Sequence, residues 1–258
     1  MKSDEVSGRG LPPTDYDLMS RVYDAGRATP DEWVLEWRTE LSDHLMSSQG
    51  PVVDVGSGTG IWAKLIADWF DIDVIAIEPS TGMRTRAAQT RPHPRVDYIA
   101  GEAENLPLRD KSCTAIWMST VVHHFSDLNA AAREARRVLP EGQPVLVRQA
   151  FSGRHDGIMW IRFFPSALRI AERRHPTVGV VVDAFTRAGF RNHDIQRVTE
   201  IAAADLHHYR NKIATRADST LELISDEEFE RGLEEITRMA KESGPEPVTA
   251  TLDLLVFT

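Results

Sequence analysis

Cysteine occurs once in this chain of 258 residues, at Cys113. A single cysteine cannot form an intrachain disulfide and cannot supply a cysteine-based zinc site, so we expect no metal. No apolar run approaches the roughly 18 residues of a membrane-spanning helix. Residues 1–13 also lack the apolar core of a signal peptide. These absences predict a cytoplasmic protein that does not enter a membrane.

Positive charge is scarce as well. The chain has 30 Lys and Arg against 39 Asp and Glu, a formal net charge of −9. This balance argues against a general nucleic-acid binder. The hydrophobic content of 41% and charged content of 27% are ordinary for a globular protein. We expect a disordered N-terminus over residues 1–15, which has almost nothing to bury, and a single domain over residues 16–258.

Residues 51–60 are the stretch around which the chain is organised. An apolar run, interrupted only by Asp54, leads directly into Gly56, Gly58 and Gly60, and a helical pattern starts at Ile61. Glycines allow a sharp turn and leave no Cβ between backbone and ligand. The first turn of the following helix offers unpaired N–H groups to the same place. The pattern predicts a strand, a ligand-binding turn and a helix.

An acidic residue follows the next strand. The dinucleotide fingerprint would have its third glycine at position 61, but Ile61 stands there. The strand-like run over residues 73–77 ends in Glu78, 22 residues after Gly56. A carboxylate at the end of a second strand can hold the two hydroxyls of a ribose. The alternative is a purely structural turn with a glutamate at the surface.

Four motifs in this order resemble the class I S-adenosylmethionine-dependent methyltransferases, in the small-molecule branch of the ubiquinone and menaquinone C-methyltransferases. They lie at residues 52–60, 77–80 with Met83, 101–108 and 121–125. The resemblance implies an α/β fold: a Rossmann-like, seven-stranded, mostly parallel sheet with helices on both faces and an antiparallel last strand. It also implies a helical cap, which we assign to residues 16–48, 151–176 and 202–243. The implied cofactor is S-adenosyl-L-methionine and the product S-adenosyl-L-homocysteine.

The resemblance carries over a set of cofactor-binding positions. Arg27 would pair with the methionine carboxylate, unless it is an ordinary loop arginine. Glu102 stands where the family usually has Asp, and would accept a hydrogen bond from the adenine amine. The whole set is Tyr23, Arg27, Asp54, Gly56, Ser57, Gly58, Glu78, Pro79, Met83, Gly101, Glu102, Ala103, Met118 and Ser119.

Two histidines follow the fourth expected strand, at the sheet edge where α/β proteins bind ligands. His123 and His124 are candidate general bases because the ordinary pKa of histidine lies near neutrality. A base is needed only if the accepting atom arrives protonated. The alternative is that the pair orders the loop or touches the cofactor.

The segment over residues 151–176 is rich in large apolar side chains and holds five arginines against two acidic residues. We expect it to form a mobile lid with residues 16–45 over a small, largely apolar acceptor that can carry an anionic group. The candidate substrate residues are Tyr16, Arg148, Trp160 and Phe164. The alternative is that these apolar groups seal a core or a subunit contact. A monomer and a homodimer both stay open.

Three functions remain in competition. The first is methyl transfer to a small molecule. The second is a different reaction on the same fold, such as a cyclisation or a redox reaction with a dinucleotide. The third is a non-catalytic binder or partner subunit. The intact glycine loop, Glu78 and Glu102 argue against it, since a subunit freed from cofactor binding need not retain them.

Local patterns also predict helix boundaries. Thr29 to Glu32 reads as a capping box that opens a helix, and Ser80 and Ser225 read as further N-caps. A first helix is expected over residues 16–23, a later one over residues 177–188, and the last two strands over residues 190–201 and 249–257.

Overall fold

The computed structural model describes residues 16–27, 29–46, 48–191 and 193–258. The disordered N-terminus expected over residues 1–15 lies outside these ranges. Within them, no helix is long and apolar enough to cross a membrane.

Seven strands form one sheet in the order β3-β2-β1-β4-β5-β7-β6. All pairings among the first five strands are parallel, whereas β7 pairs antiparallel with both β5 and β6. This confirms the predicted fold class, including the antiparallel last strand. The strands are β1 (Val52–Val55), β2 (Val74–Ile77), β3 (Val96–Ile99), β4 (Ala115–Ser119), β5 (Val145–Gln149), β6 (His193–Ala203) and β7 (Val248–Phe257).

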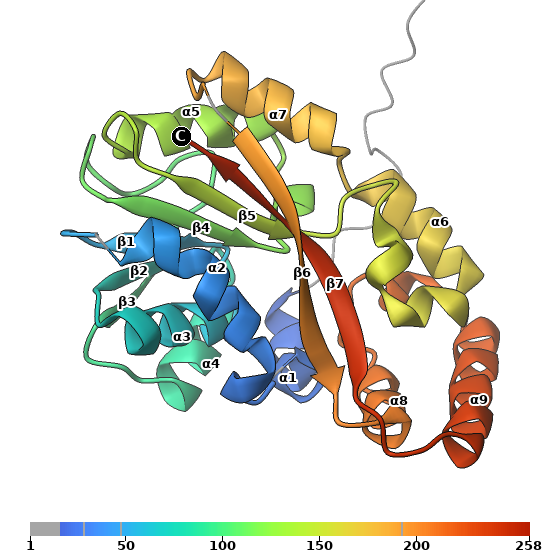
Figure 1. Cartoon of the computed structure of the whole chain (residues 1–258). Helices are drawn as coiled ribbons and strands as arrows, with labels where there is room; N and C mark the ends of the chain where they lie inside the picture. Colours follow the sequence, from blue (N-terminus) through green and yellow to red (C-terminus); the bar gives the residue numbers. More distant parts are fainter. Residues whose placement is uncertain (1–15, 28, 47, 192) are drawn as a thin grey trace, which may run out of the picture.

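Both faces of the sheet are covered, which explains why the central strands are mostly apolar. Alternate residues of β4 face opposite layers: Trp117 packs with Trp37 and Ile66, and Ile116 packs with the layer that holds Phe185. One layer contains α2 (Leu35–Leu45) and α3 (Ile61–Phe70), and the other contains α5 (Leu128–Val138) and α7 (Val178–Arg187). Figure 1 shows these two layers on either side of the sheet.

A third cluster of buried side chains lies beyond the sheet. β6 and β7 extend past β5 as a long two-stranded ribbon towards α8 and α9 (Figure 1). Tyr209, Phe229 and Ile236 pack there with Phe164 and Ile170 of the segment around α6. The remaining helices are α1 (Tyr16–Arg27), α4 (Thr81–Thr90), α6 (Pro165–Arg174), α8 (Leu206–Ala214) and α9 (Asp226–Glu242). Short 3₁₀ helices are η1 (Asp31–Val34), η2 (Val122–His124), η3 (His155–Gly157), η4 (Met159–Arg162) and η5 (Leu221–Leu223).

Most predicted helix starts are confirmed. The hydroxyl of Ser80 accepts from the N–H of Met83, and Ser225 accepts from Glu228 in the same way. The capping box at Thr29 is wrong: the chain enters a 3₁₀ turn with Pro30 at its N-cap, and the Thr29 hydroxyl donates to the Arg27 carbonyl instead. The first helix also runs on to Arg27, four residues beyond the expected end.

Candidate functional site

A cavity of about 180 Å³ lies where the glycine loop meets the cap. Asp54, Gly56 and Ser57 line it from the glycine loop, and Ser119 lines it from the end of β4. Its other walls come from α1, from η4 and from α8. The cavity therefore joins the predicted cofactor loop to the predicted acceptor side of the molecule.

The three glycines of the loop all have positive φ, as the tight turn requires: +70° at Gly56, +55° at Gly58 and +79° at Gly60. A Cβ on Gly56 would lie 2.2 Å from the side chain of Val121, and one on Gly60 would lie 2.5 Å from the Tyr98 hydroxyl. A Cβ on Gly58 would meet only Tyr23, at 3.9 Å. Gly56 and Gly60 thus allow packing within the protein, whereas Gly58 keeps space free beside the loop.

Glu78 is tied to this loop. One carboxylate oxygen accepts from the N–H of Gly58 and the other from the N–H of Ser80, each at 2.9 Å. The side chain is buried, and this burial raises its pKa above the ordinary value. Each carboxylate oxygen can accept a second hydrogen bond, so the predicted contact with ribose hydroxyls is compatible with this geometry.

Three polar atoms of cavity-lining residues are buried without a hydrogen-bond partner among the described residues: Asp54 Oδ2, Ser57 Oγ and Arg148 Nε. Burial, and then the negative charge of Glu78, raises the pKa of Asp54 to about 8. Unpaired buried polar atoms are rare in folded proteins and point to a missing polar partner. The amino and hydroxyl groups of S-adenosylmethionine would supply such partners, so the residues present fit this cofactor.

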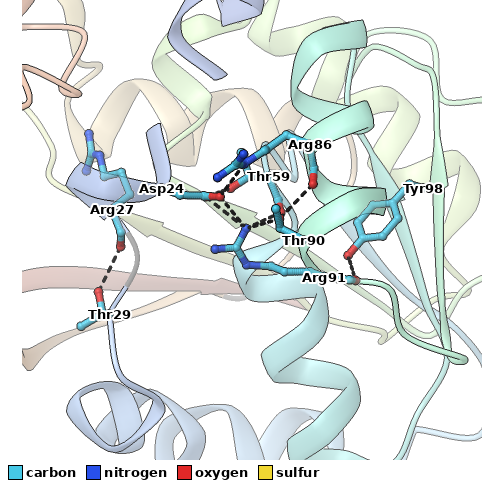
Figure 2. Close-up of polar contacts among 8 residues, drawn as sticks. All are labelled: Asp24, Arg27, Thr29, Thr59, Arg86, Thr90, Arg91 and Tyr98. Carbon is cyan, nitrogen blue, oxygen red and sulfur yellow. Dashed lines mark hydrogen bonds and ion pairs between the residues drawn. The ribbon is translucent and has the colours of Figure 1, made fainter. Parts of the chain in front are cut away.

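Helix α1 is fastened across the glycine loop. The carboxylate of Asp24 accepts hydrogen bonds from Thr59 in the loop and from Arg86 and Arg91 at α4, at 2.7–3.1 Å (Figure 2). At the other end of α1, Asp17 accepts from the N–H of Gly82 and from the Ser80 hydroxyl. Tyr23, from the same helix, lines the cavity.

The predicted carboxylate partner of the cofactor, Arg27, also lines the cavity. Its guanidinium donates to Asp218 at 2.8 Å and lies 6.0 Å from the centre of the Tyr23 ring. Arg27 is therefore at the expected place but is already paired with a carboxylate that the sequence did not single out. Its contact with the methionine carboxylate stays a prediction.

Arg148, a candidate substrate residue, is paired with a carboxylate. Its guanidinium donates twice to Glu200 at 2.6 Å and lies 4.9 and 5.0 Å from the ring centres of Trp37 and Trp62. The indole N–H of Trp37 also donates to Glu200. Arg148 lines the cavity, but its charge is compensated, so an anionic acceptor would have to compete with Glu200.

The histidine pair lies next to the cavity and does not line it. Tyr16 and His124 share a hydrogen bond of 2.6 Å, and the ring of His123 stacks 3.9 Å from that of His124. Burial, and then the charge of Arg174, lowers the pKa of His124 to about 3. Burial likewise lowers the pKa of His123 well below its usual range. Both rings are neutral at pH 7, and such weak bases are poorly matched to proton removal near neutrality. Their catalytic role stays a prediction.

Two further histidines, which the sequence reasoning missed, extend this group. The ring of His175 lies 4.4 Å from that of His123, and its Nδ1 is 2.9 Å from Nε2 of His155. His155 in turn bonds Glu172 through Nδ1 at 2.8 Å. No spacing in the sequence indicates this cluster, because its members come from η2, η3 and the end of α6.

The adenine-side candidates do not line the cavity. Met83, Ala103 and Met118 are buried, whereas Pro79 and Glu102 are exposed. At Gly101 a Cβ would lie 2.7 Å from Pro107, which explains the glycine at this position. The binding roles assigned to these six residues stay predictions.

On the acceptor side, Trp160 lines the cavity together with Ile158 and Met159. Phe164 does not: it is fully buried, stacks on Phe229 at 5.7 Å between ring centres and packs against Gly232 of α9. Its expected substrate role therefore has no support in this arrangement, because Phe164 belongs to the third cluster of the core. Sequence reasoning also missed a wall of the cavity formed by Tyr209, Lys212 and Ile213 of α8.

The comparisons with known proteins agree with this geometry. Residues 53–147 match the family described as Methyltransferase domain. The chain is 30% identical over 135 residues to a demethylmenaquinone methyltransferase of Renibacterium salmoninarum, covering 52% of this chain and 53% of the relative. It is 37% identical over 129 residues to the ubiquinone/menaquinone biosynthesis C-methyltransferase UbiE of Rubrivivax gelatinosus, covering 49% and 48%. The chain thus spans about half the length of these curated relatives.

Among solved structures, the fold is similar to that of a protein described as a methyltransferase from an antibiotic biosynthesis pathway of Anabaena variabilis. The TM-score is 0.73 at 22% identity, covering 87% of this chain and 97% of the other. At this identity the likeness shows the fold alone.

The sheet order, the glycine loop and Glu78 define a Rossmann-like fold that binds its ligand at the carboxyl ends of the parallel strands. Residues 53–147, which hold the glycine loop and Glu78, match a methyltransferase domain, and the curated relatives that the chain resembles are methyltransferases. The resemblance drawn from the four sequence motifs is confirmed.

Proposed function

We propose that this protein transfers the methyl group of S-adenosylmethionine to a small, largely apolar acceptor that carries an anionic group. The observation that carries the proposal is the continuity of the cavity. It runs from Asp54 and Ser57 at the cofactor loop to Trp160 and Ile213 under the cap.

The bound cofactor would supply a methyl group on a positively charged sulfur, which is already an excellent leaving group. The residues of this chain would therefore contribute mainly by holding the cofactor and the acceptor in the correct relative orientation. Glu78 would hold the ribose, Arg27 the methionine carboxylate, and Asp54 with Ser57 the remaining polar groups. Tyr23 and Trp160 would exclude water and keep the acceptor in line with the methyl group.

The acceptor class follows from the walls. Ile158, Met159 and Leu252 offer apolar surface, which favours a ring system or a short chain over a sugar. The curated relatives are named for quinone methylation, which is consistent with a planar acceptor. We therefore place quinols and hydroxylated aromatic acids first among acceptors to be tried.

Calorimetry with S-adenosylmethionine, S-adenosylhomocysteine, NAD and NADP tests the cofactor. We expect the first two to bind and the dinucleotides not to bind. Transfer of a labelled methyl group to a panel of quinols and aromatic acids then tests the reaction. Tight cofactor binding without label transfer to any acceptor would favour a non-methylating enzyme or a binding subunit.

A further inference from the structure

Helix α8 places a lysine in the wall of the cavity. Lys212 lines the cavity together with Tyr209 and Ile213 of the same helix. Its ammonium donates to the carbonyl of Ala202 on β6 at 3.0 Å. In the part of the chain that the structure describes, it forms no ion pair with a carboxylate, although an ammonium has three hydrogens to donate.

The other charges of the cavity are paired. Arg27 is paired with Asp218 at 2.8 Å, and Arg148 with Glu200 at 2.6 Å. Asp54, whose pKa is raised to about 8, is mostly neutral at pH 7. Among the described residues that line the cavity, the charge left over at this pH is therefore the single positive charge of Lys212.

The environment of Lys212 explains its electrostatics. The pKa of Lys212 is lowered to about 8, first by burial and then by the positive charge of Arg27. The charge of Glu200 raises this pKa, and that of Arg148 lowers it. A buried cation of this kind gains from a bound anion, since an unpaired charge in a poorly hydrated site is costly. The surrounding surface is apolar, with Met159, Trp160 and Ile213 beside it.

We propose that Lys212 binds a carboxylate of the acceptor and thereby selects apolar, monoanionic acceptors over neutral ones of the same shape. A carboxylate matches the single uncompensated charge, whereas a phosphate monoester carries nearly two negative charges at pH 7. The inference rests on the proposed function, because it assigns the acceptor end of the same cavity.

The rival occupant of Lys212 is the methionine carboxylate of the cofactor itself. Measuring the affinities of the cofactor product and of acceptor-like ligands independently shows which of the two carboxylates Lys212 binds. Suitable probes are 2-naphthoate and 2-naphthamide, which share one ring system and differ in charge. Both are titrated into the protein saturated with S-adenosylhomocysteine, at pH 7, by calorimetry.

We expect the wild-type protein to bind 2-naphthoate at least about tenfold more tightly than 2-naphthamide, as a charge-assisted hydrogen bond in a partly buried site provides. Lys212→Met should weaken 2-naphthoate binding by roughly ten- to a hundredfold and leave 2-naphthamide within about twofold. Lys212→Arg should restore the preference for the acid. Lys241→Met, at an exposed position on α9, is the matched control and should change neither probe.

The pH dependence gives a second measurement. From about pH 7 to pH 9 the wild-type preference for 2-naphthoate should decline as Lys212 loses its proton. Asp54 also ionises in this range, and the charged groups around the cavity besides Lys212 are Arg27, Arg148, Glu200 and Asp218. The Lys212→Met protein isolates the Asp54 contribution, so the difference between the two profiles belongs to Lys212.

Two results would overturn the inference. One is an unchanged preference for 2-naphthoate in Lys212→Met. The other is a loss of S-adenosylhomocysteine affinity as large as that of 2-naphthoate, which would assign Lys212 to the cofactor carboxylate. Neither result touches the proposed methyl transfer, which fails if the wild-type protein does not bind S-adenosylmethionine and its product or transfers no labelled methyl group to any acceptor. Melting curves confirm that each variant is folded, and Lys212→Gln replaces the Met variant if that one is not.

Discussion

At the residue scale, the cofactor loop depends on one buried carboxylate and three glycines that serve different purposes. Glu78 accepts from two backbone N–H groups, so it shapes the loop in addition to its proposed contact with the ribose. Among the glycines, Gly56 and Gly60 lie against other side chains, and Gly58 does not. Substitutions at these positions should therefore separate folding from binding.

Glu78→Ala should weaken binding of S-adenosylmethionine by roughly ten- to a hundredfold, because charged hydrogen bonds to the ribose are worth about 1.5–3 kcal/mol. It also leaves the N–H groups of Gly58 and Ser80 without their acceptors, at a stability cost of about 1–3 kcal/mol. Glu78→Gln keeps one acceptor oxygen, so it should lose less S-adenosylmethionine affinity and less stability than Glu78→Ala. Calorimetry and thermal unfolding measure the two effects, and unaltered affinity in Glu78→Ala would contradict the ribose role.

Gly58→Ala and Gly56→Ala form a matched pair. Both place a Cβ at positive φ, which costs about 1–2 kcal/mol. At Gly56 the new atom also lies 2.2 Å from Val121, and such overpacking adds about 1–3 kcal/mol. We expect Gly58→Ala to fold and to bind S-adenosylmethionine weakly, and Gly56→Ala to melt at a clearly lower temperature. Equal melting temperatures for the two variants would show that Val121 can move aside.

At the scale of elements, α1 lies across the cofactor loop. The helix carries Tyr23 and Arg27 into the cavity wall and is fastened to Thr59, Arg86 and Arg91 through Asp24 (Figure 2). Such polar contacts can break and re-form, so we expect α1 to open for ligand exchange.

Asp24→Ala removes the carboxylate that joins α1 to the loop and to α4. We expect S-adenosylmethionine to dissociate roughly tenfold faster, since at least one charged hydrogen bond that keeps the helix closed is lost. Stopped-flow displacement measures this rate. Asp31→Ala, at an exposed position on η1, is the control and should leave it unchanged. An unaltered dissociation rate in Asp24→Ala would mean that α1 does not gate the site.

At the scale of the whole molecule, the histidine cluster should make folding sensitive to acid. His123, His124 and His175 are half-buried at the junction of the loops after β4 and β5 with the end of α6. Burial lowers the pKa of His175 to about 4 and that of His124 to about 3, from an ordinary value of 6.5. In the unfolded chain these rings take up a proton near pH 6.5, and in the folded protein they do so only at much lower pH.

The difference in histidine pKa between the folded and unfolded states sets the direction in which stability changes with pH. Between about pH 6 and pH 4 the unfolded state binds more protons, so the free energy of unfolding falls as the pH falls, by about 1.4 kcal/mol per pH unit for each such histidine. His124→Gln should reduce this slope by about one such step. His207→Gln, at an exposed position on α8, should not. Chemical unfolding across this pH range measures the slopes, and identical slopes for wild type and His124→Gln would show that His124 is not buried neutral.

What the sequence by itself determined about this protein is local. The alternation of strands and helices, the turn at Gly56 to Gly60, Glu78 at the end of β2 and the cap residues Ser80 and Ser225 each depend on neighbours a few positions away. Backbone conformation and helix capping are decided over such distances, so these features could be predicted.

Only the tertiary structure decided which side chains meet across the chain. Arg148 pairs with Glu200, 52 positions away in the sequence, and Tyr16 bonds to His124, 108 positions away. Phe164 lies in the hydrophobic core and Lys212 lines the cavity because α6, α8 and α9 pack together beyond the sheet. Whether a charge in this protein is free or compensated depends on such long-range packing, since the partner comes from a different element and no periodic pattern specifies it.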